Sequence, residues 1–218
     1  MKKVDVIRPS SLNSIIGPSG TLRRIIKNKD FFENRGYCFE IFTYDNLLPE
    51  KKVSKLDGKK QSIIKNFLSK IKSRLRMKAK DNKILAIAYL KRNNKKINSL
   101  ISYYLSLSRD PDIVVFHSVI ECYYYLKRSR RKKSKIVLFY HSDGIPMNML
   151  LSYYPVLKNT SFFNKLLEMD KYVTDNVSKC VFISRNGQQN FLKYYPEIDI
   201  KQTTVILNGI DDLTEEEK

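Results

Sequence analysis

Six short apolar runs recur along the chain at intervals that are too long for β-hairpins. Each run is rich in Val, Ile and Phe, and its apolar residues are continuous rather than alternating. Continuous apolar character is typical of strands that are buried on both faces of a sheet. The predicted strands are Val4–Ile7, Tyr37–Phe42, Ile113–Phe116, Ile136–Tyr140, Cys180–Ile183 and Val205–Leu207.

Helical patterns fill the intervals between these runs. Residues Thr21–Asn34 place Leu22, Ile25 and Phe32 on or near one stripe, and Gly36 stands where the helix would end before the next strand. Alternation of strands and helices implies right-handed crossovers and a parallel sheet covered on both faces. The sequence therefore predicts a doubly wound α/β fold, with further helices at Asp81–Leu107, Val119–Lys127, Ser161–Val177 and Asn186–Tyr195.

The amino-acid composition indicates a folded protein with a strongly basic surface. Hydrophobic residues make up 42% of the 218 residues, which is enough for a substantial core. The formal net charge of +19 favours a polyanionic partner, and nucleic acid, anionic lipid headgroups and a diphosphate ligand all meet that condition. Charge alone does not choose among the three.

The N-terminal segment and the cysteines indicate a cytoplasmic protein. Only a strand-length apolar run precedes Arg8 and Pro9, which is unlike a signal peptide, and no apolar run is long enough to span a membrane. The cysteines, Cys38, Cys122 and Cys180, are odd in number and far apart in apolar segments. This pattern favours buried reduced thiols over disulfides or a metal site.

The segment Lys51–Lys80 concentrates the positive charge, with twelve basic residues and one acid. Its apolar residues from Ile63 to Leu75 follow the spacing of an amphipathic helix whose other face is basic. Such a helix can dock on the domain with its lysines solvated, or it can lie on an anionic membrane surface, and the two arrangements are compatible. The candidate membrane-facing residues are Lys65, Phe67, Lys70, Ile71, Lys72 and Arg74. A second basic cluster, Lys127–Lys133, is expected to be a solvated loop.

Candidate site residues follow the strands, because ligands in an open parallel sheet bind outside the carboxyl ends of the strands. After the first strand, Gly17, Pro18, Ser19 and Gly20 are predicted to form a tight loop that leads into a helix. Free backbone N–H groups and the positive end of the helix dipole suit such a loop to a phosphate. An ordinary strand-to-helix turn is the alternative, since the loop matches neither GxGxxG nor a Walker A motif.

The chain has two histidines, and each stands at the end of a predicted strand. His117 and His141 are therefore expected to share one cleft. Asp143 is placed either to orient His141 or to cap the next element. Ser184 precedes the last long helix as a candidate N-cap. The sequence contains neither GxSxG nor HExxH, so hydrolase and metalloprotease interpretations lack their required residues.

In this order, the segments resemble the N-terminal domain of glycosyltransferase family 4. The resemblance lies in the Gly-containing loop, in DIVVFHS and KIVLFYHSDG, and most specifically in CVFISRNGQQNF and TTVILNGID. It implies a GT-B fold, in which two Rossmann-like domains face each other across a cleft. It also implies a metal-independent, retaining sugar transfer that uses no cofactor besides the nucleotide-sugar donor, which is a substrate.

The resemblance implies roles for the candidate residues. The Gly17–Gly20 loop would lie near the donor diphosphate and the acceptor, and His141 would contact the transferred sugar as the catalytic residue. His117 would shape the acceptor pocket, and Ser184 and Arg185 would border the cleft. The loop reads GPSG where the family more often has paired glycines, which weakens its match to a phosphate site.

Residues 1–211 are predicted to form the acceptor-side domain, with a basic helical insertion at about 51–107, and residues 212–218 an acidic linker. The resemblance assigns the donor-binding residues to a second domain, so we expect this chain alone to be inactive. The expected acceptor is a glycan or a lipid-linked sugar in cell-surface polysaccharide synthesis, reached at the inner face of the membrane.

Two other functions remain as alternatives. One is a basic α/β module that binds nucleic acid or an anionic surface, although no recognised nucleic-acid motif is present and no nucleic-acid partner is expected. The other is a nucleotide-binding regulator, which rests on fold analogy alone.

Overall fold

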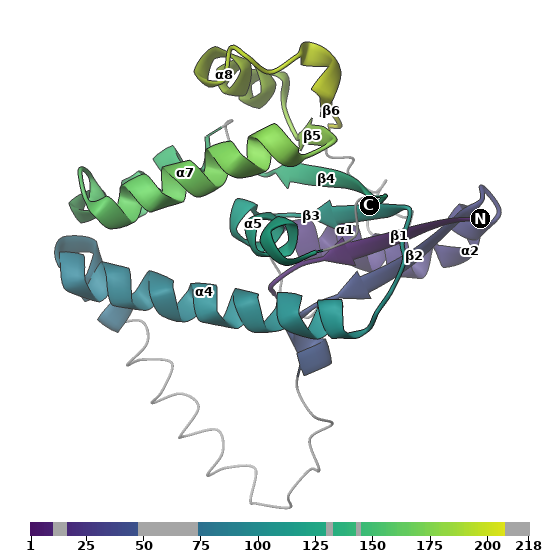
Figure 1. The fold of residues 1–218 in the computed structure, drawn as a ribbon, viewed down its shortest axis with the longest axis horizontal. Helices are drawn as coiled ribbons and strands as arrows, with labels where there is room; N and C mark the ends of the chain where they lie inside the picture. Colours follow the sequence, from purple (N-terminus) through teal and green to yellow (C-terminus); the bar gives the residue numbers. More distant parts are fainter. Residues whose placement is uncertain (11–16, 48–73, 130–132, 143–144, 208–218) are drawn as a thin grey trace, which may run out of the picture.

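The computed structural model describes residues 1–10, 17–47, 74–129, 133–142 and 145–207. Its centre is a six-stranded parallel sheet with the strand order β2-β1-β3-β4-β5-β6 (Figure 1). The strands are β1 (Lys2–Ile7), β2 (Tyr37–Phe42), β3 (Ile113–Phe116), β4 (Lys135–Tyr140), β5 (Lys179–Phe182) and β6 (Thr203–Val205). The predicted α/β class and parallel sheet are confirmed.

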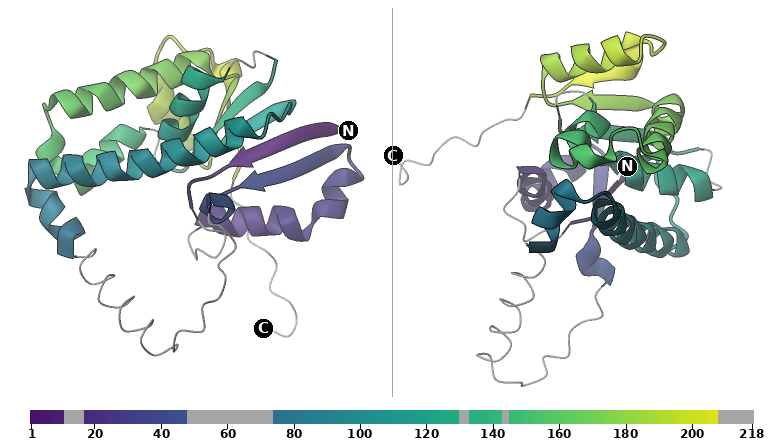
Figure 2. Two further views of the ribbon diagram at one scale, coloured as in Figure 1. Left: turned by 60° about the horizontal axis from the view of Figure 1, so that its bottom comes forward. Right: turned by 90° about the vertical axis from the view of Figure 1, so that its left-hand side faces the viewer.

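Helices cover the sheet on both faces, as a doubly wound, Rossmann-like fold requires. Figures 1 and 2 show α4, α5 and α7 on one face and α1 and α2 on the other. The helices are α1 (Gly17–Lys27), α2 (Lys29–Glu33), α4 (Lys83–Ser106), α5 (Val119–Arg128), α6 (Pro146–Tyr153), α7 (Ser161–Asn176) and α8 (Arg185–Tyr194). The described ranges also contain the short 3-10 turns η1 (Tyr44–Leu47), η2 (Pro155–Leu157) and η3 (Ile200–Gln202).

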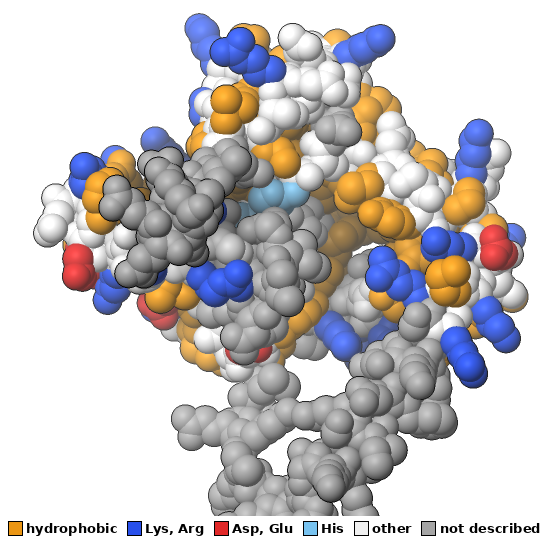
Figure 3. Space-filling view, turned by 180° about the vertical axis from the view of Figure 1, so that it is seen from behind, with side chains coloured by type: hydrophobic (Ala, Val, Ile, Leu, Met, Phe, Trp, Pro, Cys, Tyr) orange, Lys and Arg blue, Asp and Glu red, His pale blue; other side chains and the backbone are white. Residues whose placement is uncertain are grey.

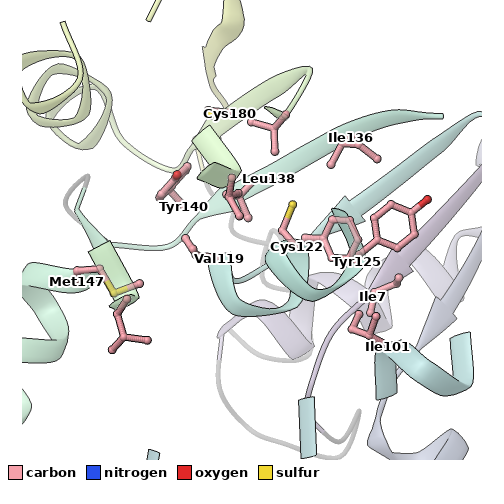
Figure 4. Packing of buried hydrophobic residues seen from close by; sticks show 14 of the residues in the cluster. Ile7, Ile101, Val119, Cys122, Tyr125, Ile136, Leu138, Tyr140, Met147 and Cys180 are labelled. Atoms are coloured by element: carbon pink, nitrogen blue, oxygen red, sulfur yellow. The ribbon is translucent and has the colours of Figure 1, made fainter. Parts of the chain in front are cut away.

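Side-chain alternation along the strands divides the core in two. On β4, Ile136, Leu138 and Tyr140 join the larger cluster with residues of α4, α5 and α7, whereas Val137 and Phe139 join the smaller cluster. Figure 4 shows Leu138 and Tyr140 beside the side chains that α5 contributes. Both faces of β4 are therefore apolar, which explains its continuous run of apolar residues.

A buried carboxylate on β1 joins three parts of the fold. Asp5 is 1% exposed, and its Oδ2 accepts hydrogen bonds from Tyr104 Oη at 2.7 Å and from Arg109 Nε at 2.9 Å. A second Arg109 nitrogen donates to Asp5 Oδ1 at 3.1 Å, and Arg109 also pairs with Glu40 of β2. We call Asp5, Tyr104 and Arg109 the Asp5 cluster; it links β1 to the end of α4 and the turn that follows it.

The structure corrects two predicted helices. Thr21–Asn34 is two helices, α1 and α2, separated at Asn28, whose side-chain amide donates to the Arg24 carbonyl oxygen and so competes with regular helix bonding. Asp81–Leu107 is interrupted at Asn82, whose Oδ1 accepts from Leu85 N at 3.0 Å and begins α4. Helix α2 ends at Glu33, and Gly36, with a φ of 81° that favours glycine, lies in the turn between α2 and β2.

The predictions for the remaining helices and strands and for the cysteines are confirmed only in part. Helix α6 was not predicted, and the last strand is Thr203–Val205, since Ile206 and Leu207 lie exposed beyond it. All three cysteines are free; Cys122 and Cys180 are buried as expected, whereas Cys38 is only partly buried. In the described part of the chain, no helix has the length and apolar character needed to cross a membrane.

The basic segments are only partly described. Residues 48–73 lie outside the described ranges, and residues 74–81 form a helix in which Arg74 and Leu75 are exposed. Leu75 is therefore not docked on the domain, which was one of the two arrangements considered for the apolar stripe; Ala79 is the buried residue of this helix in its described part. Lys127 belongs to α5 rather than to a solvated loop, because α5 continues to Arg128 and the Lys127 ammonium lies 3.8 Å from the Tyr172 ring centroid.

Candidate functional site

The candidate site lies where the strand order changes direction. Strand β1 has β2 on one side and β3 on the other, so the chain turns back across β1 at this point. Arg8 follows β1, His117 follows β3 and His141 follows β4, all at the carboxyl ends of their strands. Ligands of doubly wound sheets bind in the crevice outside such a switch point.

The two histidines are in direct contact. His117 Nδ1 and His141 Nε2 are 2.7 Å apart, and the rings stack with centroids 5.0 Å apart. The Phe139 ring stacks on His117 with centroids 5.3 Å apart. One imidazole must donate and the other accept in this hydrogen bond, so the pair is stable when both rings are neutral.

Burial keeps both rings neutral. It lowers the pKa of His117 to about 3, with further contributions from His141 and Arg8, and it lowers the pKa of His141 to about 4, with a further contribution from Arg8. At neutral pH the pair therefore offers hydrogen-bond donors and acceptors without a net charge.

Arg8, whose charge acts on both histidines, also acts on a buried carboxyl group, that of Glu121. Arg8 is 9% exposed and Glu121 of α5 is fully buried. Burial raises the pKa of Glu121 well above its usual range, against the opposing effects of the Arg8 charge and the Ser118 hydroxyl. Both carboxyl oxygens nevertheless lack a hydrogen bond of ordinary geometry within the described ranges. The pKa of Tyr44 is raised to about 12, by burial and by Glu121.

Two hollows meet at His141. The larger, which we call the polar groove, has a volume of about 800 Å³ and lies between α6 and α8. Its lining includes Asn148, Ser152, Asn190 and Lys193 together with His141. Figure 3 shows the histidines at the bottom of a hollow in this face of the molecule.

The smaller hollow, which we call the apolar cavity, has a volume of about 250 Å³. It lies between α4, α6 and α7 at the ends of β3 and β4, and both histidines line it. His141, Ser142 and Met149 line both hollows. In the ranges that the structure describes, no group of three or more His, Cys, Asp or Glu side chains is suited to a metal ion.

Comparison with known protein families identifies the chain. The profile of Glycosyltransferase Family 4 matches residues 73–212, which is more than half of the chain and includes both histidines. The chain belongs to glycosyltransferase family 4. No curated protein matches the sequence. Membership supports a glycosyltransferase function, with a nucleotide-sugar donor and an acceptor as the general substrate classes.

In this glycosyltransferase family 4 domain, the prediction that His117 and His141 lie together is confirmed. The loop predicted at Gly17, Pro18, Ser19 and Gly20 is wrong, because all four residues are in the first turns of α1. Proline is favourable in a first turn, where its missing N–H has no intrahelical partner to lose.

The other predicted residues lie away from the histidine pair or outside the described ranges. Ser184 Oγ accepts from Gly187 N at 3.0 Å, which confirms it as the N-cap of α8. Arg185 is exposed, and neither residue lines the two hollows. The residues outside the described ranges are Asp143, Lys65, Phe67, Lys70, Ile71 and Lys72.

Sequence reasoning missed Arg8, Glu121 and Ser142 as site residues. Glu121 stands three residues after Ser118, the spacing of a helix capping box, which accounts for the pattern without suggesting a site. Ser142 Oγ is buried without a hydrogen-bond partner among the described residues, although it follows a predicted site histidine directly. Position after a strand was the available signal for both Arg8 and Ser142.

Proposed function

We propose that this domain is the acceptor-side half of a retaining GT-B glycosyltransferase and that the sugar hydroxyls of its substrates bind at the histidine pair. The donor would be a nucleotide-sugar, and the acceptor a glycan or lipid-linked sugar in cell-surface polysaccharide synthesis. The observation that carries the proposal is the 2.7 Å contact between two desolvated imidazoles, of which His141 lines the polar groove.

Neutral imidazoles suit the chemistry of glycosyl transfer. Positive charge develops on the sugar ring in an oxocarbenium-like transition state. A cationic histidine beside that ring would oppose this charge, whereas a neutral one can bind hydroxyl groups without repulsion. In this proposal His141, which lines both hollows, contacts the transferred sugar, and His117 positions His141 and shapes the acceptor pocket.

The location and the membrane role remain part of the proposal. We infer a cytoplasmic protein that reaches a lipid-linked acceptor at the inner face of the membrane through its basic segment 51–80. The basic residues support this, since each one near an anionic bilayer contributes about 1 kcal/mol to binding.

The histidines supply the test of the proposed sugar site. The chain has two histidines, so ¹⁵N-histidine labelling gives one set of signals for each ring, and His117→Gln assigns them. Titration with methyl glycosides and with UDP-glucose, UDP-galactose and GDP-mannose should shift the His141 signals. A matched titration of His141→Gln should show weaker binding by calorimetry. Unchanged histidine signals with every one of these sugars would contradict the proposed site.

A further inference from the structure

Among the described residues, no charged side chain lines the apolar cavity. Most of its wall consists of aliphatic, aromatic and thioether side chains, and its polar lining residues are Asn94, Ser118, Ser142 and the two histidines. The residues used in the argument below are Leu90, Ile120, Met147, Met149, Leu150 and Leu166. The cavity is also lined by Val119, Leu138 and Tyr140, and Figure 4 shows these three side chains close together.

The cavity and the polar groove are continuous at one point. His141, Ser142 and Met149 line both, and the Ser142 hydroxyl is buried there without a partner among the described residues. A buried hydroxyl without a partner is costly unless a ligand or water binds it. The junction is therefore suited to a molecule whose polar part lies in the polar groove and whose apolar part lies in the apolar cavity.

The volume of the apolar cavity limits the size of the apolar group that can bind in it. A cavity of about 150 Å³ lined by apolar side chains stays dry and binds benzene. The present cavity of about 250 Å³ therefore holds a group larger than benzene. Because burial keeps both histidines neutral, such a group meets no charge on entering.

We propose that the apolar cavity binds the alkyl or isoprenoid aglycone of the acceptor, with the acceptor sugar at His141 in the polar groove. The position of the sugar rests on the proposed function, whereas the affinity of the cavity for an alkyl chain does not. Each methylene that enters the cavity strengthens binding about fourfold, until the cavity is full.

Methionine methyl groups report directly on the cavity. The chain has five methionines, of which Met147 and Met149 line the cavity, Met77 is exposed, and Met169 lies elsewhere on α7. With ¹³C-methyl methionine, we expect octyl β-glucoside below its micelle concentration and 1-octanol to shift Met147. Methyl β-glucoside should leave Met147 unchanged, and Met77 should respond to none of the three.

Two adjacent substitutions on α6 provide the matched control. Leu150→Trp fills the cavity and should weaken octyl β-glucoside binding at least tenfold, whereas Leu151→Trp, whose side chain does not line the cavity, should retain it. If thermal unfolding shows that Leu150→Trp does not fold, Ile120→Phe fills the cavity from α5 instead.

The outcomes separate this proposal from the proposed sugar site. If Met147 responds to neither octyl β-glucoside nor 1-octanol, or if a folded cavity-filling variant binds them as the unmodified chain does, the aglycone site is overturned. If Met147 responds to octyl β-glucoside and to 1-octanol but no sugar shifts the His141 signals, the aglycone site is supported and the proposed sugar site fails. A response of both reporters to octyl β-glucoside supports both.

Discussion

Two buried polar groupings in this protein differ in how completely their hydrogen bonds are made. In the Asp5 cluster, the carboxylate accepts three hydrogen bonds and faces a guanidinium. At the carboxyl edge of the sheet, Glu121 is equally buried, yet both of its oxygens lack a hydrogen bond of ordinary geometry to a described residue. The Ser142 hydroxyl, which follows β4, is also buried without a hydrogen-bond partner among the described residues.

The two groupings represent two kinds of buried polar group. A polar group that serves the fold alone is expected to have its hydrogen bonds made within the protein. Groups that are desolvated, incompletely bonded and shifted in pKa collect at binding and catalytic sites. The Asp5 cluster is of the first kind, whereas Glu121 and the histidine pair have the desolvation and shifted pKa values that the proposed site would require.

The largest expected effect is on stability, in the Asp5 cluster. Arg109→Met leaves the Asp5 carboxylate buried without its charged partner, and we expect the free energy of unfolding to fall by about 2 to 3 kcal/mol. The loss is below that of a fully buried pair because the Arg109 side chain is 29% exposed. Urea unfolding measures it. Lys171→Met, which removes an exposed lysine bonded to Asp175 and Glu197, is the control and should cost far less. Equal losses in both variants would contradict the structural role of the Asp5 cluster.

The histidine pair should show itself in the pH dependence of stability. The pKa of His117 is lowered to about 3 and that of His141 to about 4, so in the unfolded chain both bind protons at a higher pH than in the folded one. Their contribution to stability is present above about pH 6.5 and is lost as the pH falls toward the folded values.

Relative to the unmodified chain, we therefore expect His141→Gln to gain about 1 kcal/mol of stability for each pH unit between pH 6 and pH 4.5. Unfolding curves at four pH values measure the trend. A constant difference across this range would show that His141 is protonated in the folded protein.

Asp170 should give a smaller effect of the opposite sign. Burial raises its pKa to about 6, against the hydrogen bond from Tyr195 Oη at 2.9 Å. A raised pKa contributes stability that is present below the unfolded value near 4 and is lost as the pH rises through 6. Asp170→Asn should therefore be less sensitive to pH between 5 and 7 than the unmodified chain. Thermal unfolding at these two pH values tests this, and an unchanged pH sensitivity would mean that Asp170 is ionised throughout.

The smallest effect concerns Ser184. Its hydroxyl caps α8, so Ser184→Ala should cost about 1 kcal/mol, similar to Thr160→Ala at the cap of α7. Since Ser184 lies outside both hollows, the histidine signals and their response to sugars should stay as they are. A selective loss of sugar binding in Ser184→Ala would place this residue in the cleft after all.

The fold was accessible from sequence because its signals are local. The apolar run at Ile113–Phe116 coincides with β3, since burial on both faces is encoded residue by residue. The run at Tyr37–Phe42 coincides with β2, an edge strand that is only partly buried. The breaks at Asn28 and Asn82 were missed because a side-chain hydrogen bond, rather than apolar spacing, decides them. Helix α6 was missed because its short apolar run has no clear period.

The site was accessible only in part. Position at strand ends brought His117 and His141 together on topology alone. The approach of Arg8 to Glu121 depends on the pairing of β1 with β3, and the apolar cavity depends on how α4, α6 and α7 pack. Neither follows from any local pattern in the chain.

In the proposed sugar site, the contact between the histidine rings would decide how they bind hydroxyl groups. One proton lies between His117 Nδ1 and His141 Nε2, so the two tautomers are linked. If His117 donates, its Nε2 is an acceptor and His141 Nδ1 carries a proton; if His141 donates, the two outer nitrogens exchange these characters. The pair therefore always presents one donor and one acceptor. A ligand that binds either outer nitrogen selects what the other can bind.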